Sequence, residues 1–229
     1  MADFLKATTL SAFNRTIRSS SLITRMLFRV RVVSGPRIHW DFTTIALKRS
    51  LRRYTQPGDS VLEIGTGPYA LLSLYLARRK IRSLLANDIN QHYVNHARRT
   101  AAFNALKLEV VCGDLFETVN GTFDVIFFNA VYIPRGTGER LGLNHLHSWE
   151  TDWCGGSDGL ETISAFLHQA PAYLNPGGYV LLGFNPHYLP LAAIMDRCLQ
   201  NDYQYTLEAN SRLNPSRVLI LRFSKEKPR

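Results

Sequence analysis

A glycine turn follows an apolar stretch near residue 60, and its residue types suit ligand binding. The run 61–68 reads Val-Leu-Glu-Ile-Gly-Thr-Gly-Pro, in which Glu63 and Thr66 place polar groups beside Gly65 and Gly67. Glycine lets the backbone turn tightly and lets a ligand approach with no Cβ in the way. The turn alone predicts either a nucleotide-type ligand or an ordinary junction between a strand and a helix.

Two carboxylates stand after the next two apolar stretches. Asp88 comes 21 residues after the glycine turn, at the position that faces a ribose in Rossmann-like sites, where a carboxylate accepts from both hydroxyl groups. Its structural alternative is an N-cap for the following helix, a role that Asn90 also suits. Asp114 is placed to accept a hydrogen bond from an adenine amino group, with Leu115 over a ring face.

These three strand ends belong to consecutive βα units, whose carboxyl edges meet along one crevice. Dinucleotide oxidoreductases carry a third glycine in the first turn, whereas this chain has Tyr69 and Ala70 there. The pattern therefore favours S-adenosylmethionine (SAM) over NAD as the ligand.

The stretch 123–134 reads Phe-Asp-Val-Ile-Phe-Phe-Asn-Ala-Val-Tyr-Ile-Pro. It resembles the N-methyltransferases that carry an Asn-Pro-Pro-Tyr motif, above all the release-factor glutamine N5-methyltransferases. The likeness continues in Gly-Gly-Ser-Asp-Gly-Leu at 155–160 and Leu-Asn-Pro-Gly-Gly at 174–178, and it covers 57–183. Ala130 and Val131 stand where the family has two prolines, which restores two N–H donors and some flexibility. This altered loop leaves the acceptor open.

The resemblance implies a role for each matching residue. Asn129 would accept a hydrogen bond from the substrate nitrogen, and Tyr132 would pack beside the substrate, so both are the candidate catalytic residues. No metal is expected. The candidate cofactor-binding residues are Glu63, Gly65, Thr66, Gly67, Asp88, Ile89, Asp114, Leu115 and Asn129.

The elements that would position these residues alternate between strand-length apolar runs and helical stretches, which is typical of βα units. We expect an α/β, Rossmann-like class I methyltransferase fold, with a seven-stranded, mostly parallel sheet and helices on both faces. The segment 133–157 is too long for an ordinary connection and is predicted to be a lid or substrate loop. Strands are expected at 60–64, 83–87, 109–112, 125–128, 179–183, 203–207 and 218–223, and helices at 42–54, 69–79, 91–103, 159–174 and 189–199.

The net charge of +9 is concentrated near the N-terminus, since residues 1–58 hold eleven Lys or Arg and two Asp. Nucleic acid, an anionic substrate or a membrane surface would suit such a patch, although a solvated basic face is the simplest interpretation. We expect residues 1–41 to form a basic N-terminal extension, with a helix and a strand over 26–33, packed on a SAM-binding catalytic domain at 42–229. The three cysteines fit a reduced, cytoplasmic setting, and no apolar run is long enough for a membrane span.

The main functional hypothesis is therefore a SAM-dependent transferase, a methyltransferase that methylates a nitrogen of a small molecule. One alternative is a methyltransferase that acts on tRNA or a protein glutamine, with the basic N-terminal segment as docking surface. A second is a non-methylating enzyme in which the amino group of SAM attacks a carbon beside its own sulfonium and releases methylthioadenosine. A third is a non-catalytic scaffold with the same fold.

Overall fold

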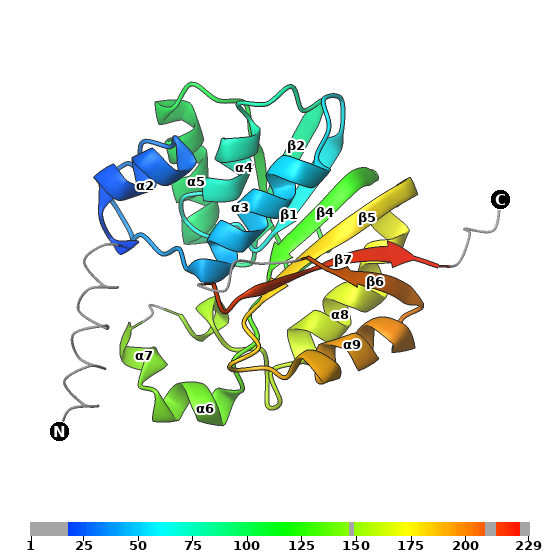
Figure 1. The fold of residues 1–229 in the computed structure, drawn as a ribbon. Helices are drawn as coiled ribbons and strands as arrows, with labels where there is room; N and C mark the ends of the chain where they lie inside the picture. Colours follow the sequence, from blue (N-terminus) through cyan, green and yellow to red (C-terminus); the bar gives the residue numbers. More distant parts are fainter. Residues whose placement is uncertain (1–17, 147–148, 209–213, 225–229) are drawn as a thin grey trace.

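A seven-stranded sheet forms the centre of the molecule (Figure 1). The structure, a computed structural model, describes residues 18–146, 149–208 and 214–224. The strand order is β3-β2-β1-β4-β5-β7-β6, with β1 to β5 parallel and β7 antiparallel to both its neighbours. This confirms the predicted mostly parallel sheet. The strands are β1 (Ser60–Ile64), β2 (Ser83–Asp88), β3 (Glu109–Cys112), β4 (Phe123–Asn129), β5 (Leu174–Phe184), β6 (Tyr203–Leu207) and β7 (Arg217–Phe223).

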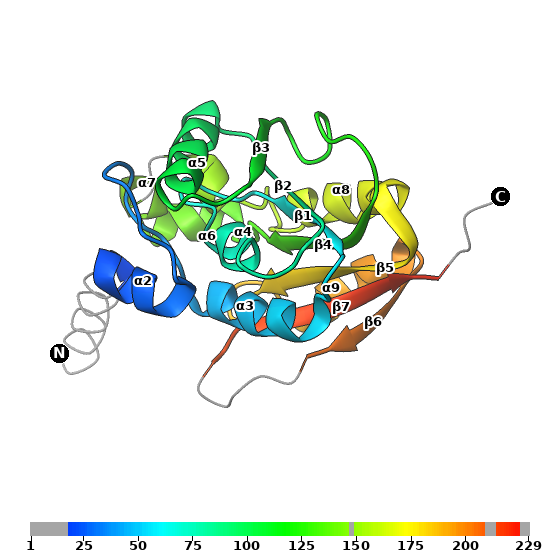
Figure 2. The same cartoon turned by 90° about the horizontal axis from the view of Figure 1, so that it is seen from above.

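Helices cover both faces of the sheet because successive strand side chains point to opposite sides. In β1, Val61 packs into the cluster that holds α3, α4 and α5, whereas Leu62 packs into the cluster that holds α8 and α9 (Figures 1 and 2). Within the described residues, no helix is long and apolar enough to cross a membrane. The helices on the two faces are α3 (Phe42–Tyr54), α4 (Leu71–Leu76) and α5 (Gln91–Phe103), then α8 (Glu161–Gln169) and α9 (Leu191–Gln200).

Side-chain caps fix the beginnings of the two longest helices. Asp41 Oδ1 accepts from the Thr44 amide at 2.8 Å and starts α3, and Asn90 Oδ1 accepts from the His92 amide at 2.9 Å and starts α5. Both helices have the predicted bounds, since such caps are local sequence signals. The predicted helix 159–174 is shorter, because Pro171 follows α8 in a separate 3₁₀ turn, η2 (Ala170–Tyr173).

The N-terminal extension contains a helix, α2 (Ser21–Phe28), where the sequence suggested a strand over 26–33. That prediction was wrong. Ser20 caps the helix by accepting from the Ile23 amide at 3.3 Å, and Arg29 ends it in the left-handed region at φ 59°. Arg29 and Arg31 therefore lie in a segment that is not assigned as a strand. Phe28 and Val30 are fully buried in the hydrophobic cluster that also contains side chains of α3.

The predicted lid segment contains short helices in its described residues, 133–146 and 149–157. It contains α6 (Arg135–Arg140), α7 (Leu143–Leu146) and a 3₁₀ turn, η1 (Glu150–Asp152). A β-bridge between Ile133 and Cys154 closes its base. Trp153 is 3% exposed and packs against Gly138, where an added Cβ would lie 1.9 Å from the indole ring. We call residues 133–157 the lid.

Candidate functional site

One cavity of about 380 Å³ lies at the carboxyl ends of β1, β2, β3 and β4. Parallel strands of a doubly wound sheet bring their carboxyl ends to one edge, where ligands bind. All nine candidate cofactor-binding residues line this cavity: Glu63, Gly65, Thr66, Gly67, Asp88, Ile89, Asp114, Leu115 and Asn129. Tyr132 is absent from the lining.

The two glycines of the first turn both have φ of 65°, a conformation that side chains other than glycine's rarely adopt. At Gly65 an added Cβ would also lie 3.1 Å from the ring of Phe128, tighter than ordinary contact. At Gly67 it would meet nothing within 4 Å. Gly65 is therefore required by both backbone and packing, and Gly67 by the backbone alone.

Asp88 holds the glycine turn in place. Its Oδ2 accepts from the Gly67 amide at 2.7 Å, and its Oδ1 accepts from the Asn90 amide at 2.9 Å. Burial raises the pKa of Asp88, while these two amides lower it. Asp88 and Asn90 were both candidate N-caps for α5, and Asn90 is the residue that caps the first turn of this helix. Asp88 instead lines the cavity.

Glu63 is a buried carboxyl at the floor of the cavity. Its Oε2 accepts from the Thr66 hydroxyl at 2.7 Å and from the Ser73 amide at 3.2 Å. Burial raises the pKa of Glu63 to about 7, although the bonds from Ser73 and Thr66 oppose that shift. Near neutral pH this group is poised between its two protonation states, so a cation in the cavity would select the carboxylate.

Asn87 is a positioning residue that the sequence analysis missed. It is 1% exposed, and its Oδ1 accepts from the Gly65 amide at 3.3 Å. Its Nδ2 donates to the carbonyl of Gly113 at 3.2 Å and to that of Leu115. The side-chain amide of Asn87 therefore connects the carboxyl ends of β1, β2 and β3. In the sequence, Asn87 is only a polar residue at the end of an apolar run, which does not indicate this role.

Asn129 ends β4 and faces the cavity. Its Nδ2 donates to Thr44 Oγ1 at 3.4 Å, which leaves the amide oxygen as its acceptor group. The Ala130 amide donates to the carbonyl of Gly183 at 3.2 Å. The N–H group regained by replacing a proline at 130 is therefore used inside the sheet.

Tyr132 lies in the core beside the cavity. It is 7% exposed, and its hydroxyl lies 3.4 Å from Thr43 Oγ1. Two glycines of the 155–160 segment pack on its backbone: an added Cβ would lie 2.8 Å from Tyr132 Cα at Gly155 and 2.5 Å from Tyr132 O at Gly159. The geometry gives Tyr132 a part in shaping the loop after Asn129.

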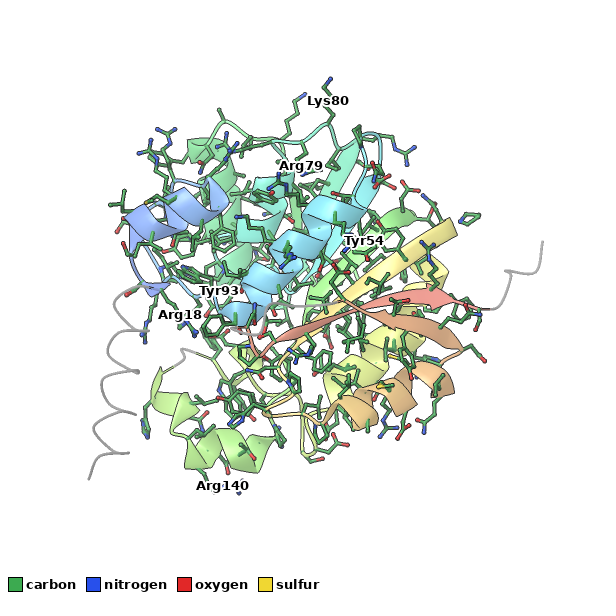
Figure 3. All side chains as sticks on the ribbon, in the orientation of Figure 1. Arg18, Tyr54, Arg79, Lys80, Tyr93 and Arg140 are labelled. Carbon is green, nitrogen blue, oxygen red and sulfur yellow. The ribbon has the colours of Figure 1, made fainter. Side chains whose placement is uncertain are left out.

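The lid supplies residues that the sequence analysis did not assign to the site, namely Thr151, Asp152 and Cys154. Tyr93 of α5, labelled in Figure 3, donates from its hydroxyl to Asp152 Oδ2 at 2.8 Å. This bond joins the lid to the helix after β2. Burial raises the pKa of Asp152 to about 6. Two residues that precede β1 in the sequence, His39 and Thr44, also line the cavity.

Comparison with known proteins agrees with this architecture. A methyltransferase small domain model matches residues 36–132. A release factor glutamine methyltransferase of Deinococcus radiodurans is 30% identical over 162 residues, 71% of this chain and 57% of that protein. A Methanocaldococcus jannaschii protein with the provisional name protein N5-glutamine methyltransferase is 36% identical over 120 residues, 52% and 58% of the two chains.

Among solved structures, a methyltransferase from Pyrococcus furiosus superposes with a TM-score of 0.68 at 23% identity, covering 92% of this chain and 97% of that one. The chain spans somewhat more than half the length of the two curated relatives above. The order of the motifs, the sheet topology and these matches all indicate the same methyltransferase fold. Residues 36–132 therefore match the methyltransferase small domain family, and the chain has the class I SAM-dependent methyltransferase fold.

Proposed function

We propose that this protein is a SAM-dependent methyltransferase that methylates an amide nitrogen of a macromolecule, with a protein glutamine as the acceptor. The observation that carries the proposal is the convergence of Glu63, Asp88, Asp114 and Asn129 on one cavity. The curated relatives named above are glutamine methyltransferases, which favours the glutamine alternative over the small-molecule hypothesis. A cytoplasmic location stays a prediction.

The residues of the cavity fit SAM on their chemistry. The molecule carries an ammonium group, two ribose hydroxyls and an adenine ring, and the cavity places a buried carboxyl at Glu63, a second carboxylate at Asp88 and an apolar side chain at Leu115. Its volume lies within the range of about 300–1,000 Å³ that is usual for ligand pockets. We assign the methionine end to Glu63 and the glycine turn, the ribose to Asp88, and the adenine to Asp114 and Leu115.

Methyl transfer forms a C–N bond while the bond from the methyl carbon to sulfur breaks, and the nitrogen then releases one proton to solvent. The nitrogen lone pair must therefore be aimed at the methyl carbon. When bound, SAM supplies an electrophilic methyl group on its sulfonium. Asn129 orients the acceptor by taking a hydrogen bond from its N–H, and Thr44 fixes the orientation of the Asn129 amide. The lid, held to α5 by Tyr93 and Asp152, excludes water from the reacting atoms.

The proposal is tested by locating the transferred label. Purified protein is incubated with methyl-labelled SAM and, separately, with the protein, RNA and small-molecule fractions of cells that lack the gene. We expect label in the protein fraction, S-adenosylhomocysteine as the nucleoside, and one added methyl on a glutamine by mass spectrometry.

Each other result identifies a different function. Label in the RNA fraction or in the small-molecule fraction would overturn the glutamine assignment. Methylthioadenosine as the nucleoside would indicate the internal cyclisation of SAM. Absence of both SAM binding by calorimetry and nucleoside product would indicate a scaffold.

The affinity for SAM is expected to rise with pH through the titration of Glu63. Because burial raises its pKa to about 7, the carboxyl holds a proton at pH 6 and loses it on binding a cation. Proton linkage then gives about a tenfold gain in affinity between pH 6 and pH 8. Calorimetry in two buffers of different ionisation enthalpy measures both the affinity and the released proton. The same pH dependence in Glu63→Gln would show that the ligand's own amino group is responsible.

A further inference from the structure

Helices α2 and α3 both lie beside α4 on one face of the molecule (Figure 2). This face carries a strongly basic surface. Two adjoining clefts on this face share Arg29 and Arg78, and we call them together the basic groove. Among the residues that the structure describes, no aspartate or glutamate lines either cleft. The cations of the groove include Arg25, Arg29, Arg31, Lys48, Arg52 and Arg78.

Within the described residues, these cations form no ion pair with an aspartate or glutamate. In the described part of the chain, the ion pairs involve other basic residues, such as Arg53 with Glu208 and Arg82 with Asp124. Burial lowers the pKa of Lys48, and the nearby charges of Arg29 and Arg52 lower it further. This crowding of like charge is unfavourable in the free protein, and an anion in the groove would relieve it.

The groove is built from segments that are distant in the sequence. The Arg31 amide donates to Asn104 Oδ1 at 2.9 Å, and Asn104 Nδ2 donates back to the Arg31 carbonyl at 2.7 Å. Arg79, which follows α4 and is labelled in Figure 3, donates to the Arg52 carbonyl of α3 at 3.2 Å. These bonds fix the backbones that carry the cations, so the charges are held in a defined arrangement.

Arg29 occupies a backbone position that favours glycine or asparagine. It ends α2 in the left-handed region at φ 59°, and its amide donates to the Arg25 carbonyl at 2.8 Å. A side chain costs about 1–2 kcal/mol in this conformation. The sequence thus has an arginine at a position where the backbone conformation favours glycine or asparagine. Backbone strain of this kind is typical of functional positions.

Aromatic rings lie beside the cations. The Lys48 ammonium lies 5.1 Å from the centre of the Tyr75 ring, which lines the groove. The Arg31 guanidinium lies 4.8 Å from the centre of the Phe103 ring, a side chain that is 50% exposed. Positive charge interleaved with ring faces is the arrangement that binds single-stranded nucleic acid, because phosphates meet the cations and unpaired bases stack on the rings.

We propose that the basic groove binds a single-stranded segment of RNA, a partner beyond the proposed methyl transfer. Cellular DNA is largely a duplex with its bases stacked inside, so RNA is the polyanion that offers both phosphates and free ring faces. The groove lies near the cavity: on α3, Lys48 follows Thr44 of the cavity by one turn, about 6 Å along the helix axis. A bound RNA would therefore lie next to the methyl-transfer site.

Fluorescence anisotropy with a labelled single-stranded RNA of mixed sequence, measured without SAM, tests the proposal. We expect binding that weakens steeply with salt, with a slope of about −0.7 per contacted phosphate in a plot of log affinity against log salt. Arg29→Glu with Arg78→Glu is expected to lower the affinity more than tenfold and to make the slope shallower by about 1.4. Arg29→Lys with Arg78→Lys should retain most of the affinity, because the charge remains.

The matched control is Arg197→Glu with Arg222→Glu, which makes the same charge change on α9 and β7 and should retain binding. An equal loss in this control would show that net charge, not the groove, is responsible and would overturn the proposal. No RNA binding by the wild type at 50 mM salt, or tighter binding of poly-glutamate peptide or duplex DNA, would also overturn it. Unchanged SAM affinity of the groove variants would show that they are folded, so failure here is separable from failure of the proposed methyl transfer.

Discussion

An Asn129→Ala variant is expected to transfer the methyl group about 100-fold more slowly than the wild type while its affinity for SAM changes less than about threefold. Asn129 is placed to take a hydrogen bond from the acceptor nitrogen, and Thr44 at 3.4 Å fixes its amide. Without that bond the acceptor lone pair is no longer aligned with the methyl carbon. The single-turnover rate of methyl incorporation and calorimetry with SAM measure the two quantities separately.

Two further variants make this test specific. Thr44→Ala keeps Asn129 but removes the hydroxyl that orients it, so a smaller loss of about tenfold is expected. Asn95→Ala changes an exposed asparagine on α5 and should behave as the wild type. If Asn129→Ala transferred the methyl group within threefold of the wild-type rate, Asn129 would not position the acceptor.

An Asp88→Asn variant is expected to bind SAM about 100-fold more weakly and to remain folded. The carboxylate of Asp88 can accept from both ribose hydroxyls, and hydrogen bonds to charged groups contribute about 1.5–3 kcal/mol each. The asparagine keeps the size of the side chain and one oxygen for the amide of Gly67 or Asn90. Because burial disfavours the charged form of Asp88, a neutral side chain is tolerated by the fold.

Calorimetry with SAM and thermal unfolding without it check this prediction together. Asp114→Ala is the matched comparison, since Asp114 lines the same cavity but is exposed to solvent. Water competes for its hydrogen bonds, so a loss of less than about tenfold is expected. Unchanged SAM affinity in a folded Asp88→Asn variant would exclude the ribose assignment.

The sequence determined which segments of this protein form strands and which polar residues stand near their carboxyl ends. β1, β3 and β6, together with α3 and α5, have the predicted bounds, because apolar runs and capping residues such as Asp41 and Asn90 are local signals. Consecutive parallel units must align their carboxyl edges, so the sequence predicts one crevice at three strand ends. The resemblance to the Asn-Pro-Pro-Tyr N-methyltransferases implied the nine cofactor-binding candidates, all of which line the cavity.

Other features depend on contacts between distant segments. Asn87 ties three strand ends, and Asp152 meets Tyr93 across 59 residues. The cations of the basic groove come from α2, α3 and the segments that follow α2 and α4. Residues 26–33 alternate like a strand, yet 26–28 form the end of a helix that Ser20 caps, and 29–33 form neither helix nor strand. Periodicity describes only the neighbours of a residue along the chain. Which polar groups meet across the fold is decided by how the packed elements lie against one another, and that is a property of the tertiary structure alone.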